Sequence, residues 1–314
     1  MEDRLIVTAS PHIREASTTR GLMGNVVIAL LPAVIAAGLI FGVQALVLVA
    51  VTTLACVAFE YLYEVLLKKP NTVGDLSAVV TGIILALNMP VGMPLWIAVV
   101  GAFVAIVITK QLFGGLGYNF ANPAIVGRIA MAMGFAGAMS NYPHPVNNID
   151  AFASATPLAV AGQLGSADYV TLLLGNHGGV LGETCAITLL IGGIYLIWTK
   201  VISPTIPVTY LATVAVFSLL CGYDPIYQLL SGGLMLGAIF MATDYVTSPT
   251  TEKGKLVFGI GLGVITCLIR FFGTMNEGVS FAILLMNILT PYIEKATAPK
   301  VLGAAKAKKE GGKA

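Results

Sequence analysis

Charged side chains are scarce in this sequence. Only 10% of its 314 residues are Asp, Glu, Lys or Arg, whereas 57% are hydrophobic. A soluble domain carries about 25% charged residues, and so few charges cannot cover a surface that faces water. The composition therefore excludes a soluble globular protein and predicts an integral membrane protein. The polar first 20 residues predict no removable signal peptide.

The residues that build metal sites and soluble active sites are also few. The four cysteines form no C-x-x-C pair and the three histidines have no metal-ligand spacing, so we expect no disulfide bond and no metal site within the chain. The sequence contains no P-loop, no dinucleotide-binding glycine motif and no nucleophile motif. It has no basic nucleic-acid surface either. These absences argue against nucleic-acid partners and against a catalytic residue of the chain's own.

Long apolar segments are abundant. Ten are expected, at about 22–43, 45–67, 75–89, 93–112, 120–139, 180–199, 205–222, 225–243, 255–273 and 277–294. They predict an all-α polytopic membrane protein. Several are shorter than the ~20 residues that cross a bilayer upright, and the third ends at Asn88-Met89-Pro90. Such segments indicate broken helices, which are tolerated where the backbone is buried in protein or lines a cavity.

Basic residues fix the expected orientation. With ten crossings, one side receives Arg4, Arg14, Arg20, Lys68, Lys69, Lys110, Lys200, Lys253, Lys255 and Lys295. The positive-inside rule makes that side the cytoplasm. Both termini are then cytoplasmic. The loop between the fifth and sixth segments has no Lys or Arg, and is extracytoplasmic.

The two groups of five segments resemble each other. Leu22-Met23-Gly24 corresponds to Val180-Leu181-Gly182, and Phe113-Gly114 corresponds to Phe272-Gly273, in the same order along each half. Because five is odd, the second half enters the membrane upside down, as in the inverted repeats of transporters. We expect a cytoplasmic segment at 1–20, repeats at 21–139 and 180–297, the loop at 140–179, and a Lys-rich tail at 298–314.

Two residues near the fifth segment are candidates for ligand binding. Asn122 precedes Pro123 after a glycine-rich turn, a pattern typical of a helix start. The same pattern also suits an anion or an aromatic ring at the helix N-terminus. Arg128 lies inside the segment, where a charge costs roughly 2.5–3.5 kcal/mol unless it finds a partner. The partner of Arg128 could be a phosphate, the carboxylate of Glu183 or a helix C-terminus.

Two carboxylates are candidates for an ion pathway. Glu60 lies well inside the second segment, and Asp244 follows the eighth, which looks broken. Intramembrane carboxylates are default candidates for carrying ions or protons. Each also has a simpler interpretation, as a helix-end carboxylate or one paired with Lys or Arg.

The loop contains Asp150-Ala151-Phe152-Ala153-Ser154-Ala155-Thr156-Pro157-Leu158. Ser, Ala, Thr and Pro are ordinary loop residues. However, Asp150 to Thr156 resembles the flavinylation motif Asp-x-x-Ser/Thr-Gly/Ala-Ala-Thr. The motif's Gly is absent, as is a Gly after Asp150, but small residues are kept. With Lys110-Gln111-Leu112-Phe113-Gly114-Gly115 and Asn119-Phe120-Ala121-Asn122-Pro123-Ala124, nearly the whole chain resembles the D subunit of the Rnf complex and the related B subunit of the sodium-translocating NADH:quinone reductase.

This resemblance implies a subunit of an ion-translocating ferredoxin:NAD oxidoreductase in the bacterial cytoplasmic (inner) membrane. It implies FMN joined to Thr156 through a phosphoester, with Asp150, Ser154 and Ala155 forming the motif and a flavin transferase as the maturation partner. It allows a second, non-covalent flavin (riboflavin or FMN) between the halves. The other Rnf subunits (A, B, C, E and G), membrane lipid, and Na⁺ or H⁺ are the implied partners.

Two other classes of protein remain open. Solute channels and secondary transporters of the urea or ammonium type also use five-plus-five inverted repeats. A purely structural membrane subunit is the third interpretation. A covalently bound flavin at Thr156 separates the first hypothesis from both.

Overall fold

The computed structural model describes residues 17–142, 169–175, 177–183, 185–273 and 278–299. Every regular element in these ranges is a helix, which confirms the all-α prediction. Four helices are long and apolar enough to cross a membrane: α1, Thr19–Phe41; α2, Val43–Leu66; α12, Glu252–Phe272; and α13, Val279–Thr297. The others are shorter or interrupted.

The first half follows the predicted segments. After α1 and α2 come the short 3₁₀ helix η1 (Val73–Asp75), α3 (Ser77–Leu87), α4 (Leu95–Phe103), the π-helix η2 (Val104–Gln111), α5 (Pro123–Gly134) and α6 (Ala136–Met139). The helix α4 runs directly into η2. The 11-residue α3 ends at Leu87, three residues before Pro90, so the third segment is short, as predicted.

The second half begins with α7 (Tyr169–Leu174), a short helix inside the range predicted as loop. It continues with α8 (Ala186–Trp198), α9 (Thr205–Leu220), α10 (Pro225–Leu230), α11 (Leu234–Leu236), the π-helix η4 (Gly237–Met241), α12 and α13. The eighth segment is broken between α10 and α11, where Gly232 adopts a positive φ of 68°. A non-glycine residue would be strained in that conformation.

The halves repeat the same packing. In the first, α2 packs on α3 and α4, and α5 packs on α4 and η2. In the second, α9 packs on α10 and α12, and α13 packs on α12. The halves meet through corresponding helices, α1 against α8 and α5 against α13. These pairings are those expected of two repeats related by a two-fold axis.

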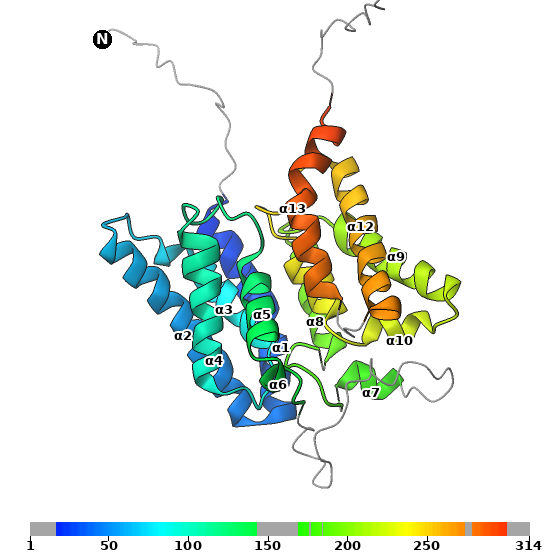
Figure 1. Cartoon of the computed structure of the whole chain (residues 1–314), viewed down its shortest axis with the longest axis horizontal. Coiled ribbons are helices and arrows are strands. Elements are labelled where there is room, and N and C mark those ends of the chain that lie inside the picture. The colour runs from blue at the N-terminus through cyan, green and yellow to red at the C-terminus, as the bar shows by residue number, and fades with distance from the viewer. Residues whose placement is uncertain (1–16, 143–168, 176, 184, 274–277, 300–314) are drawn as a thin grey trace, which may run out of the picture.

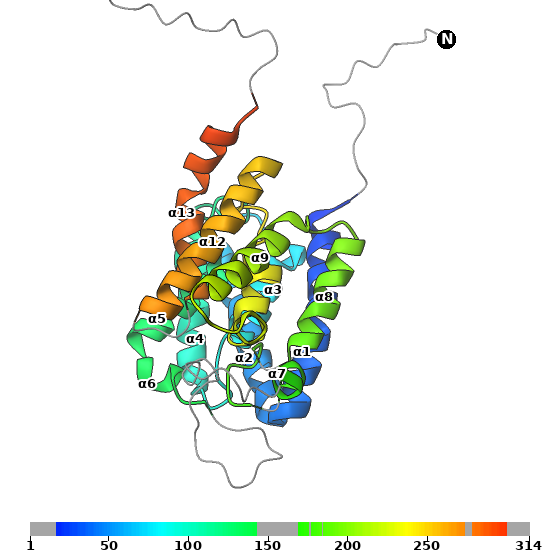
Figure 2. The same ribbon diagram turned by 90° about the vertical axis from the view of Figure 1, so that its right-hand side faces the viewer.

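Different segments of the chain lie at the two ends of the helix bundle. The first turn of α1 and the last turn of α13 lie at the same end, which we call the terminal face (Figure 1). The helices α6 and α7 lie at the opposite end, the loop face, in both views (Figure 2). An odd number of crossings in each half gives this arrangement, with the flanks of the central loop facing away from both termini.

Glycines let the helices approach closely at the join between the halves. A Cβ atom on Gly192 of α8 would lie 2.3 Å from the carbonyl oxygen of Ala29 on α1. Small residues of this kind drive helix packing in membranes, where apolar side chains gain little by leaving lipid. The join therefore depends on close contact of α1 and α8.

We expect Gly192→Ala to destabilise the protein by about 1–3 kcal/mol, the usual effect of overpacking. Gly134→Ala is the control, because a Cβ there meets no atom within 4 Å and alanine favours helix. Thermal unfolding of the purified protein, followed by its helical circular dichroism, measures both. Equal midpoints for the two variants would contradict the packing argument.

Candidate functional site

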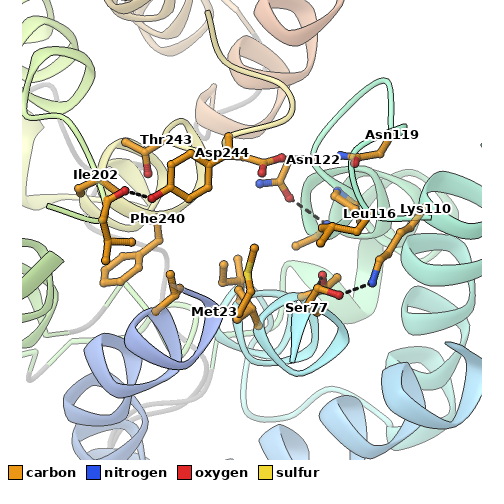
Figure 3. Close-up of a pocket in the computed structure, with 18 of the residues that line it drawn as sticks. Met23, Ser77, Lys110, Leu116, Asn119, Asn122, Ile202, Phe240, Thr243 and Asp244 are labelled. Atoms are coloured by element: carbon orange, nitrogen blue, oxygen red, sulfur yellow. Dashed lines mark hydrogen bonds between the residues drawn. The ribbon is translucent and has the colours of Figure 1, made fainter. Parts of the chain in front are cut away.

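A cavity lies between the halves, and residues of both halves line it. Figure 3 shows its walls. It lies nearer the terminal face, because its lining includes Met23 from the start of α1 and Tyr245 from the segment before α12. Its polar lining residues are Ser77, Thr81, Lys110, Asn119, Asn122, Thr243, Asp244 and Tyr245.

Two π-helices shape the cavity. In η2 the amide of Leu112 donates to the carbonyl of Val107 at 3.0 Å, and in η4 the amide of Ala242 donates to that of Gly237 at 2.8 Å. Each bond spans five residues, one more than in an α-helix. The widened turn changes the direction of the side chains that follow it, and such turns are frequent at functional sites. Here η2 supplies Lys110 to the cavity and η4 supplies Phe240.

Asn122 begins α5 as predicted. Its Oδ1 accepts from the amide of Ala124 at 3.0 Å, and Pro123 occupies the first helical position. Its Nδ2 donates to the carbonyl of Met241 at 3.2 Å. One side chain thus caps a helix of the first half and holds the end of η4 in the second half, on the wall of the cavity.

Asp244 faces the cavity from the second half. Its carboxylate accepts from the hydroxyl of Thr247 at 3.0 Å and from the amide of Val246 at 3.5 Å. Asn119 also hydrogen-bonds to it. Neutral donors hold this carboxylate, and it is half-buried.

Glu60 is paired with Lys110. Both side chains are buried, and Nζ of Lys110 lies 2.7 and 3.0 Å from the two carboxylate oxygens of Glu60. The same Nζ donates to Oγ of Ser77 at 2.5 Å, and Nε2 of Gln111 donates to Glu60 at 3.0 Å. Lys110, counted above among the boundary charges, is therefore a buried partner instead. Glu60 does not line the cavity, but the lysine that it holds does.

Arg128 lies away from the cavity lining. Its Nη1 donates to Oγ of Ser280 on α13 at 2.5 Å, and its Nη2 is 3.9 Å from Oε1 of Glu183. The carboxylate of Glu183, one of the partners considered from sequence, is present beside it. Nearby in the second half, Arg270 donates to the carbonyls of Gln228 at 2.8 Å and Ser231 at 3.1 Å. Through its contacts with Ser280 and Glu183, Arg128 joins the first half to the second.

The flavinylation motif lies outside the described residues, with Thr156, Asp150, Ser154 and Ala155. The chain on either side of it, at Tyr142 and Tyr169, is described. Sequence reasoning missed Lys110 and Ser77 as lining residues. Lys110 did give a signal, because a lysine at the end of an apolar segment can turn inward as well as outward.

Comparison with known proteins gives concordant matches. The sequence profile of the NQR2, RnfD, RnfE family matches residues 6–303. The chain is 50% identical to the D subunit of the Na⁺-translocating ferredoxin:NAD⁺ oxidoreductase complex of Acetobacterium woodii, over 98% of each chain. It is 38% identical to the D subunit of the proton-translocating ferredoxin:NAD⁺ oxidoreductase complex of Clostridium ljungdahlii, over 95% of this chain and 96% of the relative. It is 34% identical to the D subunit of the ion-translocating oxidoreductase complex of Mannheimia succiniciproducens, over 95% of this chain and 97% of the relative.

The buried pair generates a stability prediction. Lys110→Met leaves the carboxylate of Glu60 buried without its cation, and removing one partner of such a pair costs about 3–5 kcal/mol. Adding Glu60→Gln removes the orphaned charge and should recover most of the loss. Thermal unfolding of the single and double variants measures this. If the double variant is as unstable as the sum of the two single variants, the charges are not paired as described.

Proposed function

The chain belongs to the NQR2, RnfD, RnfE family, and from this membership we propose that it is the D subunit of an ion-translocating ferredoxin:NAD⁺ oxidoreductase in the bacterial cytoplasmic membrane. The observation that carries the proposal is the match over nearly the whole chain at 50% identity. The subunit carries electrons and contributes to ion movement, together with the other Rnf subunits (A, B, C, E and G). The terminal face is cytoplasmic, in line with the basic residues that flank it.

FMN joined to Thr156 is the first part of this proposal. The motif supports it, as do α6 and α7, the helices before and after the motif, which lie at the loop face (Figure 1). A flavin transferase outside the cytoplasm can reach that side. FMN supplies one- and two-electron chemistry that side chains lack. Thr156 is then an attachment point, Asp150 serves recognition by the transferase, and Ser154 and Ala155 are the small residues of the motif.

A second, non-covalent flavin in the cavity is the next part. Phe240 and Tyr245 offer aromatic walls to a flavin ring, and Asn119 and Asn122 add polar side chains that hydrogen bonds within the protein hold in place. Among the described lining residues Lys110 is the one cation, and Glu60 already holds it. Because Asp244 adds a carboxylate, the lining favours neutral riboflavin over the phosphate of FMN. Arg128, which does not line the cavity, is not a ligand of this flavin.

The ion path is proposed to include Asp244. This carboxylate is held by neutral donors and lines the cavity, so it can exchange a cation or a proton without breaking an ion pair. The named relatives include both a sodium-translocating and a proton-translocating complex. Glu60, the other candidate from sequence, is engaged with Lys110, and a proton suits it better than Na⁺.

Thr156→Ala tests the covalent flavin. We expect the unaltered chain to fluoresce on a denaturing gel and to have the intact mass of the polypeptide plus one FMN phosphoester, and the variant to lose both. Thr171→Ala, in α7, is the control and should keep both. An unmodified chain from cells that contain the transferase would exclude the covalent flavin. Normal coupled activity of Thr156→Ala would favour a purely structural subunit.

Asp244→Asn tests the ion path. The amide keeps the shape of the side chain but loses its charge, so ion uptake by vesicles that contain the complex should fall more than the rate of electron transfer. Thr199→Val, whose hydroxyl donates to the carbonyls of Tyr195 and Leu196 outside the cavity, is the control and should change neither. Unchanged ion uptake in Asp244→Asn would remove this carboxylate from the path. Solute flux through the chain in the absence of redox substrates would favour a channel instead.

A further inference from the structure

A second hollow, of about 1170 Å³, opens on the terminal face beside the cavity. Its lining includes Thr19 at the start of α1, and also Glu64, Thr72, Asp75 and Gln111. Thr72 is exposed there, whereas the side chain of Glu64 beneath it is buried. The hollow therefore brings water to the outer end of a buried polar cluster.

Thr72 connects two carboxylates. Its amide donates to Oε2 of Glu64 at 3.1 Å, and its hydroxyl is in hydrogen-bond contact with Oε1 of Glu64. The same hydroxyl is 3.2 Å from Oε1 of Glu60. A hydroxyl has one proton to donate, so it serves one carboxylate at a time. The other contact is a hydrogen bond only when that carboxyl group carries a proton of its own.

The cluster continues inward to the cavity. Glu60 holds Nζ of Lys110, and that Nζ donates to Oγ of Ser77. Lys110 and Ser77 both line the cavity, and Figure 3 shows their hydrogen bond at its rim. Each step from Glu64 through Thr72 and Glu60 to Lys110 is a contact of hydrogen-bond length, and the chain of contacts connects the hollow to the cavity.

The charges in this cluster do not balance. Glu60 and Glu64 are two buried carboxylates of α2, and Lys110 is the one buried ammonium beside them. The other ionisable groups near them are Asp75, which accepts from Ser77, the thiol of Cys56 on α2, and Lys69 on the hollow, whose Nζ lies over the ring of Tyr63. One added proton neutralises the two carboxylates and the ammonium. A cluster that takes up and passes on one proton fits this composition, whereas a purely structural ion pair needs only Glu60 and Lys110.

We propose that Glu64, Thr72, Glu60 and Lys110 form a proton relay from the terminal face to the cavity. The proposal rests on the cavity flavin proposed above, which takes up protons when partner redox centres of the complex supply its electrons. The cluster starts with the added proton on Glu60. Lys110 would be the residue that supplies a proton, from Nζ, to a reduced flavin bound in the cavity, and the lysine would be left as an amine. The carboxylic acid of Glu60 then gives its proton to that amine. Glu64 takes up a proton from water in the hollow and passes it to the carboxylate of Glu60 through the hydroxyl of Thr72. The net change is one proton from the terminal face for each proton given to the flavin.

The test uses the purified complex and the exposed link of the relay. Thr72→Val removes the hydroxyl and keeps the shape, and Thr72→Ser restores the hydroxyl. A pH-indicator dye in weak buffer reports proton uptake when reductant is mixed with the complex. We expect Thr72→Val to slow uptake at least about tenfold, a conservative share of the roughly 10²–10⁴ that a positioned proton donor contributes. We expect Thr72→Ser to take up protons at close to the unaltered rate. Thr199→Val, which loses a hydroxyl that donates to the carbonyls of Tyr195 and Leu196 outside the cavity and the relay, is the matched control and should keep the unaltered rate.

Two further measurements make the outcomes distinct. The first measures the non-covalent flavin that the unaltered complex releases on denaturation. If none is released, the proposal of a flavin in the cavity is wrong, whereas the contacts within the cluster are unaffected. If this flavin is present and Thr72→Val keeps both the rate of proton uptake and its solvent isotope effect, the relay is overturned. Glu64→Gln, which keeps the size of the side chain but cannot carry the proton, gives the same test independently if Thr72→Val fails to assemble.

Discussion

The structure depends on one constraint, that a polar group inside a membrane must find its partner within the protein. Lys110 pairs with Glu60, and Arg128 contacts Glu183 and Ser280. The amide group of Asn122 hydrogen-bonds both to the start of its own helix and to the end of η4. The two π-helices and the broken eighth segment are departures from the α-helix that occur where the backbone lies against the cavity or between the halves. The constraint thus ties the irregular backbone and the buried charges to the same region, the join of the two repeats.

The repeated fold carries opposite charges at its two ends. Gln111 and Arg270 occupy corresponding positions, each two residues before a Phe-Gly pair. Gln111 donates to the carboxylate of Glu60 near the terminal face, whereas Arg270 donates to carbonyls of the broken segment towards the loop face. One cluster has two buried carboxylates and one ammonium, and the other has two guanidinium groups and one buried carboxylate. The two halves therefore share a backbone arrangement but place a mainly acidic cluster at one end and a mainly basic cluster at the other.

Much of the fold was predictable from local patterns. Hydropathy located the segments, proline and glycine marked the third and eighth as short or broken, and Asn122-Pro123 gave the start of α5, because each signal lies within a few residues of its effect. The partners of buried charges were not predictable in this way. Glu60 and Lys110 are on different segments, and only the packing of α2 against η2 brings them together. For the same reason the partner of Arg128 stayed open among three candidates, and Lys110 was wrongly placed at the membrane boundary. The short helix α7 gave no periodic signal that separated it from the loop.

Stability alone does not explain the pair of Lys110 and Glu60. Replacing a buried ion pair with apolar residues of similar volume is often neutral or stabilising, because the desolvation of both charges offsets their attraction. An apolar pair would therefore hold α2 against η2 at least as well. What an apolar pair lacks is a proton that can move. When Glu60 as a carboxylic acid gives its proton to Lys110 as an amine, a carboxylate and an ammonium form, and the net charge of the pair remains zero. The transfer between these two side chains therefore leaves no net charge in a medium of low dielectric, which is a reason to bury both of them beside the cavity.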